Sequence, residues 1–438
     1  MGSQTELKKK QVSFIIPALS IAWCVASVVL LFVFPDTFDK ANYRFYDWKT
    51  SLCQRPEAAP QVVHVDVDDE AISKYGQWPW DRALSAKIVD RLAEFGARAV
   101  IFDILYTSAG RSPEGNERFF EAIKNAGMVI PAMTMGTAEQ QRQWSLEGDQ
   151  GRFDALYQYR AWVVNVPRSF QLLKARVLRE TYVPLEPIIR NSASLGHVKA
   201  TPDTDGVHRR IPLFVTLEDK LIPSLSLAAL QVYWKFSPRD VKFSPDGTVQ
   251  ILREGRTVKI PVDSKGMMMI NWTGIRDEFK HYTVNDVLSE EPDFSRASRY
   301  KGKIVIIGVT GTGSTDFGVT PLAVESPLSR VQSNALSTII MEEFIVTVRA
   351  FPIPVMLALI LAILFAIVSM ELRFSVGMIL GAGIPALFIV VCLLAWVSLR
   401  LDLPVMEFLA VFCPAALIAL AGKGVSLEQQ ASRMQETV

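Results

Sequence analysis

Cysteine is scarce in this sequence, and its placement excludes a disulfide framework. The 438 residues include only four cysteines. Three of them, Cys24, Cys392 and Cys413, lie within long apolar runs. Cys53 therefore has no cysteine partner outside those runs, so neither a disulfide nor a cysteine-based zinc site is available to the polar part of the chain. That part must fold on its hydrophobic core alone.

Histidine and net charge are also low, which narrows the choice of function. There are four histidines, namely His64, His197, His208 and His281. They have no metal-ligand spacing along the sequence, and the question of a metal stays open. The formal net charge is +1, whereas nucleic-acid binding requires a clustered basic face. The sequence therefore predicts no nucleic-acid partner.

Four long apolar runs are present, and none has a charge near its centre. They are residues 12–34, 352–370, 374–398 and 403–421. Each is close to the ~20 residues that a helix needs to cross a membrane. We predict four transmembrane helices, and the lack of central charges disfavours a channel or a proton-coupled transporter. A cleaved signal peptide is the alternative for the first run, which is longer than the apolar core of such peptides and lacks a small-residue cleavage site.

Basic residues beside the outer runs predict the orientation of the chain. Three lysines at positions 8–10 precede the first run, and Lys423 and Arg433 follow the last. Such residues mark the cytoplasmic side. We therefore expect both ends in the cytoplasm of a bacterial cell, with the chain in the inner membrane. The domains outside the four runs are then 1–11 and 422–438, both cytoplasmic, and 35–350, which is extracytoplasmic.

Residues 35–350 combine strand-like and helix-like segments. Residues 62–69 and 96–104 contain β-branched apolar runs, and apolar residues recur at helical spacing over 83–95. These three segments predict one right-handed βαβ unit. Residues 303–310 are typical of a second buried parallel strand. We predict an α/β domain with a mixed, partly parallel sheet and flanking helices, on a base of four transmembrane helices.

Several shorter segments complete this prediction. Residues 119–126 are typical of a helix, and Ser224 is a candidate cap for a helix that follows it. Asp205-Gly206 predicts a hairpin turn between extended runs at 196–198 and 207–215. Residues 134–182 are polar and weakly patterned, which indicates an insertion of unassigned role.

Acidic residues gather where the predicted strands end. The carboxyl ends of parallel strands form the natural ligand crevice of an α/β sheet. The candidate ligand-binding residues are Asp66, Asp68, Trp78, Arg82, Asp103 and Asp316. A purely structural role is the alternative: Asp68 or Asp69 caps a turn, Asp66 bonds backbone amides, Asp81 caps the next helix and the tryptophans cover the sheet end.

Signals for catalysis are weak. Asp66-Val67-Asp68 matches the short acidic motifs of some phosphatases and sugar transferases. No lysine and acidic loop can be named to complete a phosphatase. The glycine-containing segment 308–313 lacks the G-x-x-x-x-G-K-[ST] pattern of a phosphate loop. We therefore expect no catalytic residue and no cofactor.

A longer set of motifs resembles a known family. The set comprises Val65-Asp66-Val67-Asp68-Asp69-Glu70, Trp78-Pro79-Trp80-Asp81-Arg82, Phe102-Asp103, Asp205-Gly206-Val207 and Gly302-Lys303. It resembles the second class of cyclase/histidine-kinase-associated sensory extracellular domains, CHASE2. The resemblance implies one membrane span before an extracellular sensor and three after it. It also implies a cytoplasmic output of the cyclase or kinase type, which is either a separate partner or a missing C-terminal region.

The resemblance implies a membrane-anchored sensor or receptor that is not an enzyme. The alternatives are a structural subunit of an envelope complex and, third, a metal-dependent extracytoplasmic hydrolase. The expected partners are the lipid bilayer, an unidentified extracytoplasmic ligand, and either a second copy of the chain or a separate effector. A helical seam in the tail would pass the signal on. Its residues are Leu427, Ala431, Met434 and Val438.

Overall fold

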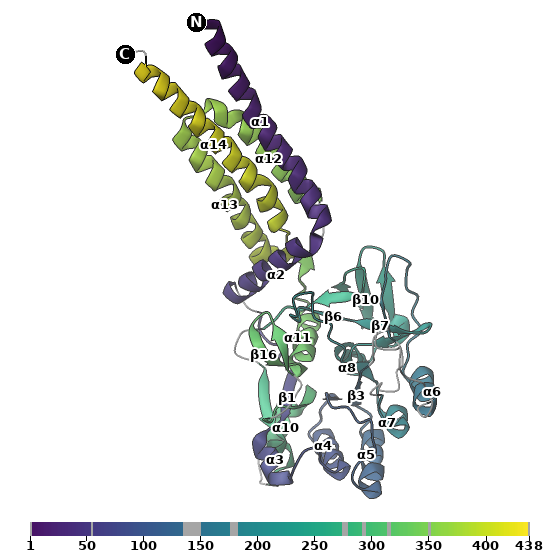
Figure 1. The fold of residues 1–438 in the computed structure, drawn as a ribbon. Coiled ribbons are helices and arrows are strands. Elements are labelled where there is room, and N and C mark those ends of the chain that lie inside the picture. The colour runs from purple at the N-terminus through teal and green to yellow at the C-terminus, as the bar shows by residue number, and fades with distance from the viewer. Residues whose placement is uncertain are drawn as a thin grey trace. The chain divides into compact units, whose positions relative to one another are not determined.

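The computed structural model describes the chain in eight stretches and divides it into two compact units. The described residues are 2–53, 56–134, 150–175, 183–273, 279–290, 295–312, 317–348 and 352–436. Met1–Gln54 and Val346–Val438 form one unit, called here the helical unit. Arg55–Ile345 form the other, called the α/β unit. Figure 1 shows the elements of each unit.

The helical unit packs long helices around buried alanine and phenylalanine side chains. Its helices are α1 (Gly2–Val33), α2 (Pro35–Leu52), α12 (Pro352–Glu371), α13 (Phe374–Leu399) and α14 (Met406–Glu436). Helix α14 contacts α1, α12 and α13. Ala358, Ala362 and Ala415 are fully buried between them, and small residues of this kind let helices approach closely in a membrane. A short parallel pair of strands joins the segment before α12 to the connection between α13 and α14. The strands are β17 (Val346–Thr347) and β18 (Leu401–Asp402).

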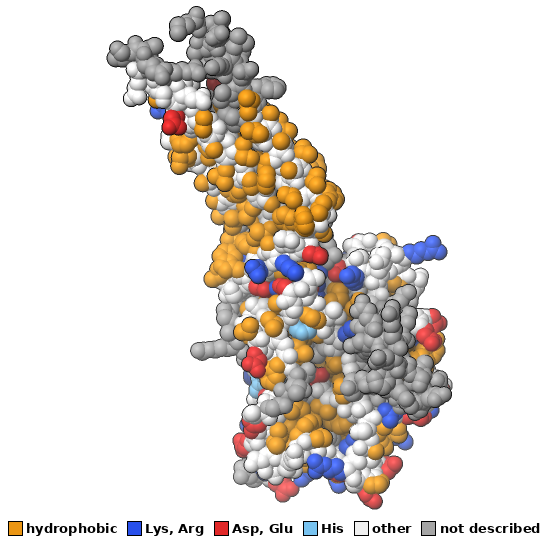
Figure 2. Space-filling view, viewed as in Figure 1, with side chains coloured by type: hydrophobic (Ala, Val, Ile, Leu, Met, Phe, Trp, Pro, Cys, Tyr) orange, Lys and Arg blue, Asp and Glu red, His pale blue; other side chains and the backbone are white. Residues whose placement is uncertain are grey.

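Three of the four predicted membrane spans are confirmed as candidates by length and composition. Within the described residues, α12, α13 and α14 are long and apolar enough to cross a membrane. Residues 17–33 of α1 pass the same test only together with α2, which is bent away from it by 88°. Figure 2 shows hydrophobic side chains over the visible face of these helices, as expected for contact with lipid. The fourth span, over residues 12–34, stays a prediction.

The α/β unit is built on a parallel sheet of six strands within the described residues, in the order β13-β1-β14-β2-β3-β5. The strands are β13 (Lys280–Thr283), β1 (Val62–Val67), β14 (Ile304–Val309), β2 (Ala99–Phe102), β3 (Val129–Met133) and β5 (Gly196–His197). Every neighbouring pair is parallel. Such sheets need a layer of helices on each face.

Helices cover both faces of the sheet. On one face lie α4 (Arg82–Glu94), α5 (Pro113–Ala126) and α9 (Val284–Leu288), which share a core with Val63, Val65 and Val67 of β1. On the other face lie α8 (Leu225–Trp234) and α11 (Ser329–Ile340), which share a core with Val62. Alternate residues of β1 therefore pack into two different cores, because successive side chains of a strand point to opposite faces of the sheet.

Smaller sheets and helices surround this layer. The strands are β9 (Val241–Ser244), β10 (Thr248–Arg253) and β11 (Arg256–Pro261); β6 (Arg210–Pro212) with β12 (Met267–Met269); β4 (Leu173–Ala175), β7 (Phe214–Leu217) and β8 (Lys220–Pro223); and β15 (Phe317–Thr320) with β16 (Ala323–Pro327). The helices are α3 (Asp69–Tyr75), α6 (Gln150–Tyr159), α7 (Glu186–Asn191), α10 (Arg296–Tyr300) and the 3₁₀ turn Pro238–Asp240. The mixed, partly parallel α/β fold is thus confirmed.

One prediction about strand pairing is wrong, and another is extended. β1 and β2 are parallel strands of one sheet with α4 between them in the sequence, as the βαβ prediction requires, but β14 lies between them in the sheet and pairs with both. The runs at 196–198 and 207–215 do not form a hairpin, since β5 pairs with β3 and β6 pairs with β12. The Asp203–Gly206 turn itself is present, with the Gly206 amide donating to the Asp203 carbonyl at 2.9 Å. In both cases the partner comes from a distant part of the sequence.

One helix prediction is confirmed and another is extended. Ser224 caps α8 by accepting a hydrogen bond from the Leu227 amide. The helix predicted over 119–126 begins earlier, at Pro113, where the Ser112 hydroxyl accepts from the Gly115 amide. The predicted insertion over 134–182 contributes α6 and β4 in its described part.

Candidate functional site

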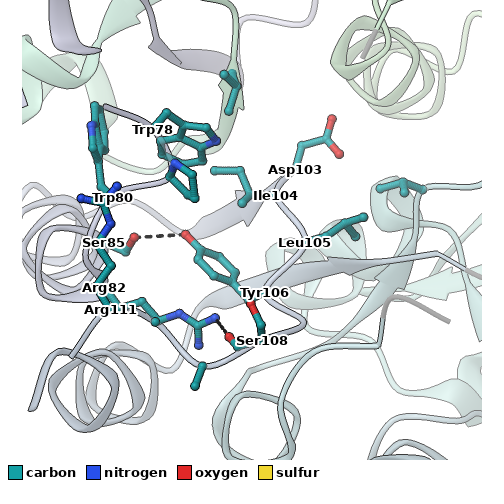
Figure 3. A pocket seen from close by; sticks show the side chains of 15 residues that line it. Trp78, Trp80, Arg82, Ser85, Asp103, Ile104, Leu105, Tyr106, Ser108 and Arg111 are labelled. Carbon is teal, nitrogen blue, oxygen red and sulfur yellow. Dashed lines mark hydrogen bonds between the residues drawn. The ribbon is translucent and has the colours of Figure 1, made fainter. Parts of the chain in front are cut away.

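The loops that follow β2 and precede α4 enclose a pocket in the α/β unit. Its volume is about 750 Å³, within the range of small-molecule sites. The lining residues are Trp78, Pro79, Trp80, Arg82, Ser85, Asp103, Ile104, Leu105, Tyr106, Ser108, Ala109, Gly110, Arg111, Val198 and Val309. Three candidate ligand residues, Trp78, Arg82 and Asp103, are therefore brought together (Figure 3).

The two tryptophans have different surroundings. Trp80 is buried, and its indole nitrogen donates to the Gly76 carbonyl at 2.6 Å. Trp78 is half-buried and lies edge-on to Trp80, with ring centroids 5.1 Å apart. Trp80 thus holds the loop against the core, as the structural alternative predicted. Trp78 keeps part of its ring accessible at the pocket.

Asp81 fixes the start of α4. Its carboxylate accepts from the Ala83 amide at 2.9 Å and from the Ser112 hydroxyl at 2.8 Å. These hydrogen bonds, first that from Ala83, lower the pKa of Asp81. The predicted cap is confirmed, and it ties the start of α4 to the start of α5. The cap also sets the position of the next residue, Arg82.

Arg82 is a buried cation beside the pocket. Only 5% of the residue is exposed, and burial lowers its pKa. One terminal nitrogen donates to the Ser108 carbonyl, and the guanidinium lies 5.2 Å from the centroid of the Tyr106 ring. The other terminal nitrogen, Nη1, is buried without a hydrogen-bond partner among the described residues. A buried donor of this kind is costly unless it is satisfied, and an anionic ligand would satisfy it.

The ring of Tyr106 packs against the guanidinium of Arg82. The residue is buried, its hydroxyl lies 3.1 Å from that of Ser85, and burial raises its pKa. The ring packs against Phe102 and Phe119 of the core. Tyr106 and Ser85 are lining residues that no sequence motif indicated. The position of Tyr106, just beyond the end of β2, is the signal that could have identified it.

Asp103 lies across the pocket from Arg82 in Figure 3. It directly follows β2, and its backbone amide donates to the Ile307 carbonyl at 2.9 Å. Ile104 and Leu105 continue from it along the apolar wall. The pocket therefore combines a buried cation, an acidic residue and an aromatic and aliphatic lining.

The other candidate acids lie outside this lining. Asp68 caps α3 by accepting from the Ala71 amide at 2.8 Å, which confirms the structural alternative. Asp69 accepts from the Thr312 amide and hydroxyl at 2.7 and 2.6 Å. Asp66 contacts His281 and accepts no backbone-amide hydrogen bond within the described part of the chain, which corrects the structural alternative for this residue. Asp316 lies outside the described residues. Asp66 and Asp68 are not part of the pocket lining to which Asp103 belongs.

Comparison with known families gives one match. The family model of the CHASE2 domain matches residues 23–370. No curated protein matches the chain. No solved structure matches it either.

Proposed function

This chain belongs to the CHASE2 domain family, and from that premise we propose that it is a membrane-anchored sensor that binds a small organic anion in the Trp78–Arg82 pocket. CHASE2 is a family of sensory domains, and candidate membrane helices accompany the domain here. The proposed ligand has a carboxylate or phosphate for Arg82 and a flat or apolar body for the aromatic wall. The proposed sensor has no catalytic activity of its own.

The buried guanidinium of Arg82 is the observation that carries this proposal. Its Nη1 has no hydrogen-bond partner among the described residues, although desolvated donors are normally satisfied. A guanidinium binds carboxylate and phosphate oxygens with matching geometry. Trp78 and Tyr106 add aromatic rings to the lining, which suit a planar or apolar group.

The ligand proposal is tested by melting the full chain in detergent with millimolar carboxylates and phosphate esters. A compound present at 100 times its dissociation constant should stabilise the folded state by about 2.7 kcal/mol. Arg82→Lys keeps the charge but removes the planar fork, so we expect it to reduce this stabilisation strongly. Arg118→Ala removes an exposed arginine of α5 that is not in the lining, and it should respond like the unmodified chain. An equal response of Arg82→Lys and Arg118→Ala would contradict the site.

We also propose that the α/β unit is extracytoplasmic and that both ends of the chain are cytoplasmic. The basic residues beside the apolar runs support this orientation. The start of α1 and the end of α14 lie at the same end of the helical unit (Figure 1), which agrees with it.

Cysteine labelling in intact cells tests the topology. In a chain with Cys53→Ser, a Lys301→Cys site should react with a membrane-impermeant thiol reagent, because Lys301 is exposed in the α/β unit. Gln4→Cys and Gln429→Cys should react only after the cells are opened. Labelling of either terminal site in intact cells, or protection of Lys301→Cys, would overturn the proposed orientation.

The signal is proposed to leave through the tail of α14. That helix continues to Glu436, so Leu427, Ala431 and Met434 lie on helical turns; Val438 lies outside the described residues. Leu427 and Met434 are 42% and 66% exposed, which leaves their side chains accessible to a second copy or an effector. The spacing of these residues supports a seam of this kind.

A further inference from the structure

Two histidines and an aspartate from distant parts of the sequence meet on one face of the main sheet. His64 and Asp66 lie two residues apart on β1, so their side chains leave the same face. His281 on β13 is the register partner of His64. Val62, two residues before His64, joins the core that α8 and α11 cover. The strand pattern therefore places all three side chains on that face.

These three side chains are close enough to share one ion. A nitrogen from each imidazole and one oxygen of Asp66 all lie within 4.8 Å of one another. The Nδ1 atom of His281 is 2.6 Å from Oδ2 of Asp66. The two imidazole rings stack, with centroids 4.4 Å apart and planes inclined by 13°.

The three side chains differ in burial. His64 is the fixed, buried member of the group, and His281 is the most exposed. His64 is buried, and its ring lies 5.7 Å from that of Phe279. The side chains of Asp66 and His281 are 15% and 33% exposed. An ion could enter beside His281 and be held partly out of water, where attraction to the Asp66 carboxylate is stronger than at the surface.

We propose that His64, Asp66 and His281 bind one divalent transition-metal ion. Two imidazole nitrogens and a carboxylate oxygen are ligands typical of Zn²⁺ and Fe²⁺, whereas Ca²⁺ and Mg²⁺ prefer oxygen alone. Three protein ligands leave at least one coordination position for water or a further ligand. The site shares no residue with the pocket lining, so it is independent of the function proposed above.

Binding requires a local rearrangement. Ligand atoms of a tetrahedral zinc ion lie about 3.3 Å apart when the bonds are about 2.0–2.1 Å long. The hydrogen bond between Asp66 and His281 must therefore open as the ion enters. A neutral His281 then carries its proton on Nε2 so that the Nδ1 lone pair faces the ion, whereas a charged His281 releases one proton to solvent. The ion would then link the edge strand β13 to β1.

Zinc binding by the full chain tests this site. The protein is purified in detergent through a tag without histidine, stripped with a chelator and dialysed against Zn²⁺. We expect one tightly held Zn²⁺ per chain and a higher melting temperature with Zn²⁺ than without it. His281→Ala and Asp66→Asn should each weaken binding by about 100-fold or more, since loss of an outer-shell partner alone costs roughly 10–100-fold.

Lys280→Ala is the matched control, because Lys280 is an exposed neighbour of His281 on β13. It should bind Zn²⁺ like the unmodified chain and show the same rise in melting temperature. Failure of the unmodified chain to retain zinc would overturn the proposal. So would equal retention by the double variant Asp66→Asn, His281→Ala.

Discussion

Replacing Arg209 by alanine is expected to cost the chain about 3–5 kcal/mol of folding stability, because it removes the cation that Asp205 binds and one of the two arginines beside the buried Asp203. Arg209 is the largest fully buried side chain of the described residues. Its two terminal nitrogens each donate to an oxygen of Asp205 at 2.8 Å, and one of them also donates to Asp203 at 3.2 Å. The Asp203 side chain is only 9% exposed. Thermal unfolding of the full chain at pH 7 measures the loss.

Arg190→Ala is the control for this prediction. Arg190 pairs with Glu186 at 2.7 Å, but both side chains are at least 40% exposed. Such surface pairs contribute about 0–1 kcal/mol. Arg209→Met should be nearly as damaging as Arg209→Ala, since it restores volume but not charge. A loss at position 209 no larger than that at position 190 would contradict the buried-cluster interpretation.

The folding stability that comes from the cluster of Arg209, Asp203 and Asp205 depends on pH, and the direction follows from the pKa shifts of the two acids. Hydrogen bonding to Arg209 is the largest cause that lowers the pKa of Asp205 below its ordinary 3.8. The stability from Asp205 is therefore fully present above that value and is lost as pH falls toward the lower pKa of the folded state. Burial raises the pKa of Asp203, so this residue has the opposite effect. Measurements at pH 7 consequently report the full contribution of Asp205.

The same cluster shows which parts of the fold could be predicted from the sequence. Asp205-Gly206 predicted a turn because glycine adopts the left-handed conformation readily, and Gly206 has φ +87°. The predicted hairpin failed, because β6 pairs with β12, more than fifty residues later. Turns, caps and strand periods depend on neighbours in the sequence, whereas the choice of a strand's partner depends on long-range packing.

The candidate site residues show the same difference between contacts that are local in the sequence and contacts between distant residues. Asp68 and Asp81 cap helices as expected, since a cap needs only an amide two or three residues away. Asp66 and His281 are 215 residues apart and meet only through the register of β1 and β13. No spacing rule for metal ligands applies to such a pair, so the histidines gave no signal in the sequence. The position of β14 between β1 and β2 was hidden for the same reason.

Within the helical unit, Asp402→Ala is expected to lower the melting temperature of the full chain in detergent by roughly 10 °C, as a loss of about 3–5 kcal/mol implies. Lys49 donates to Asp402 at 2.6 Å, and its side chain is fully buried. Its ammonium also lies 4.5 Å from the ring centroid of Trp396 and 5.1 Å from that of Phe45. The substitution would leave this ammonium with aromatic rings but without its carboxylate, and ring faces compensate only part of a charge.

The reverse change, Lys49→Met, should cost less than Asp402→Ala. The Asp402 side chain keeps 18% exposure, so water can solvate the carboxylate, and methionine packs well against Phe45 and Trp396. Lys87→Met is the control, because its pair with Glu290 is 3.5 Å long and exposed; we expect a change in stability below about 1 kcal/mol.

The decisive measurement is the double variant Lys49→Met, Asp402→Ala, which removes both charges and should melt at a higher temperature than Asp402→Ala alone. If the double variant melts no higher, the ion pair does not link α2 to the connection between α13 and α14, and the buried ammonium must be stabilised by the aromatic rings.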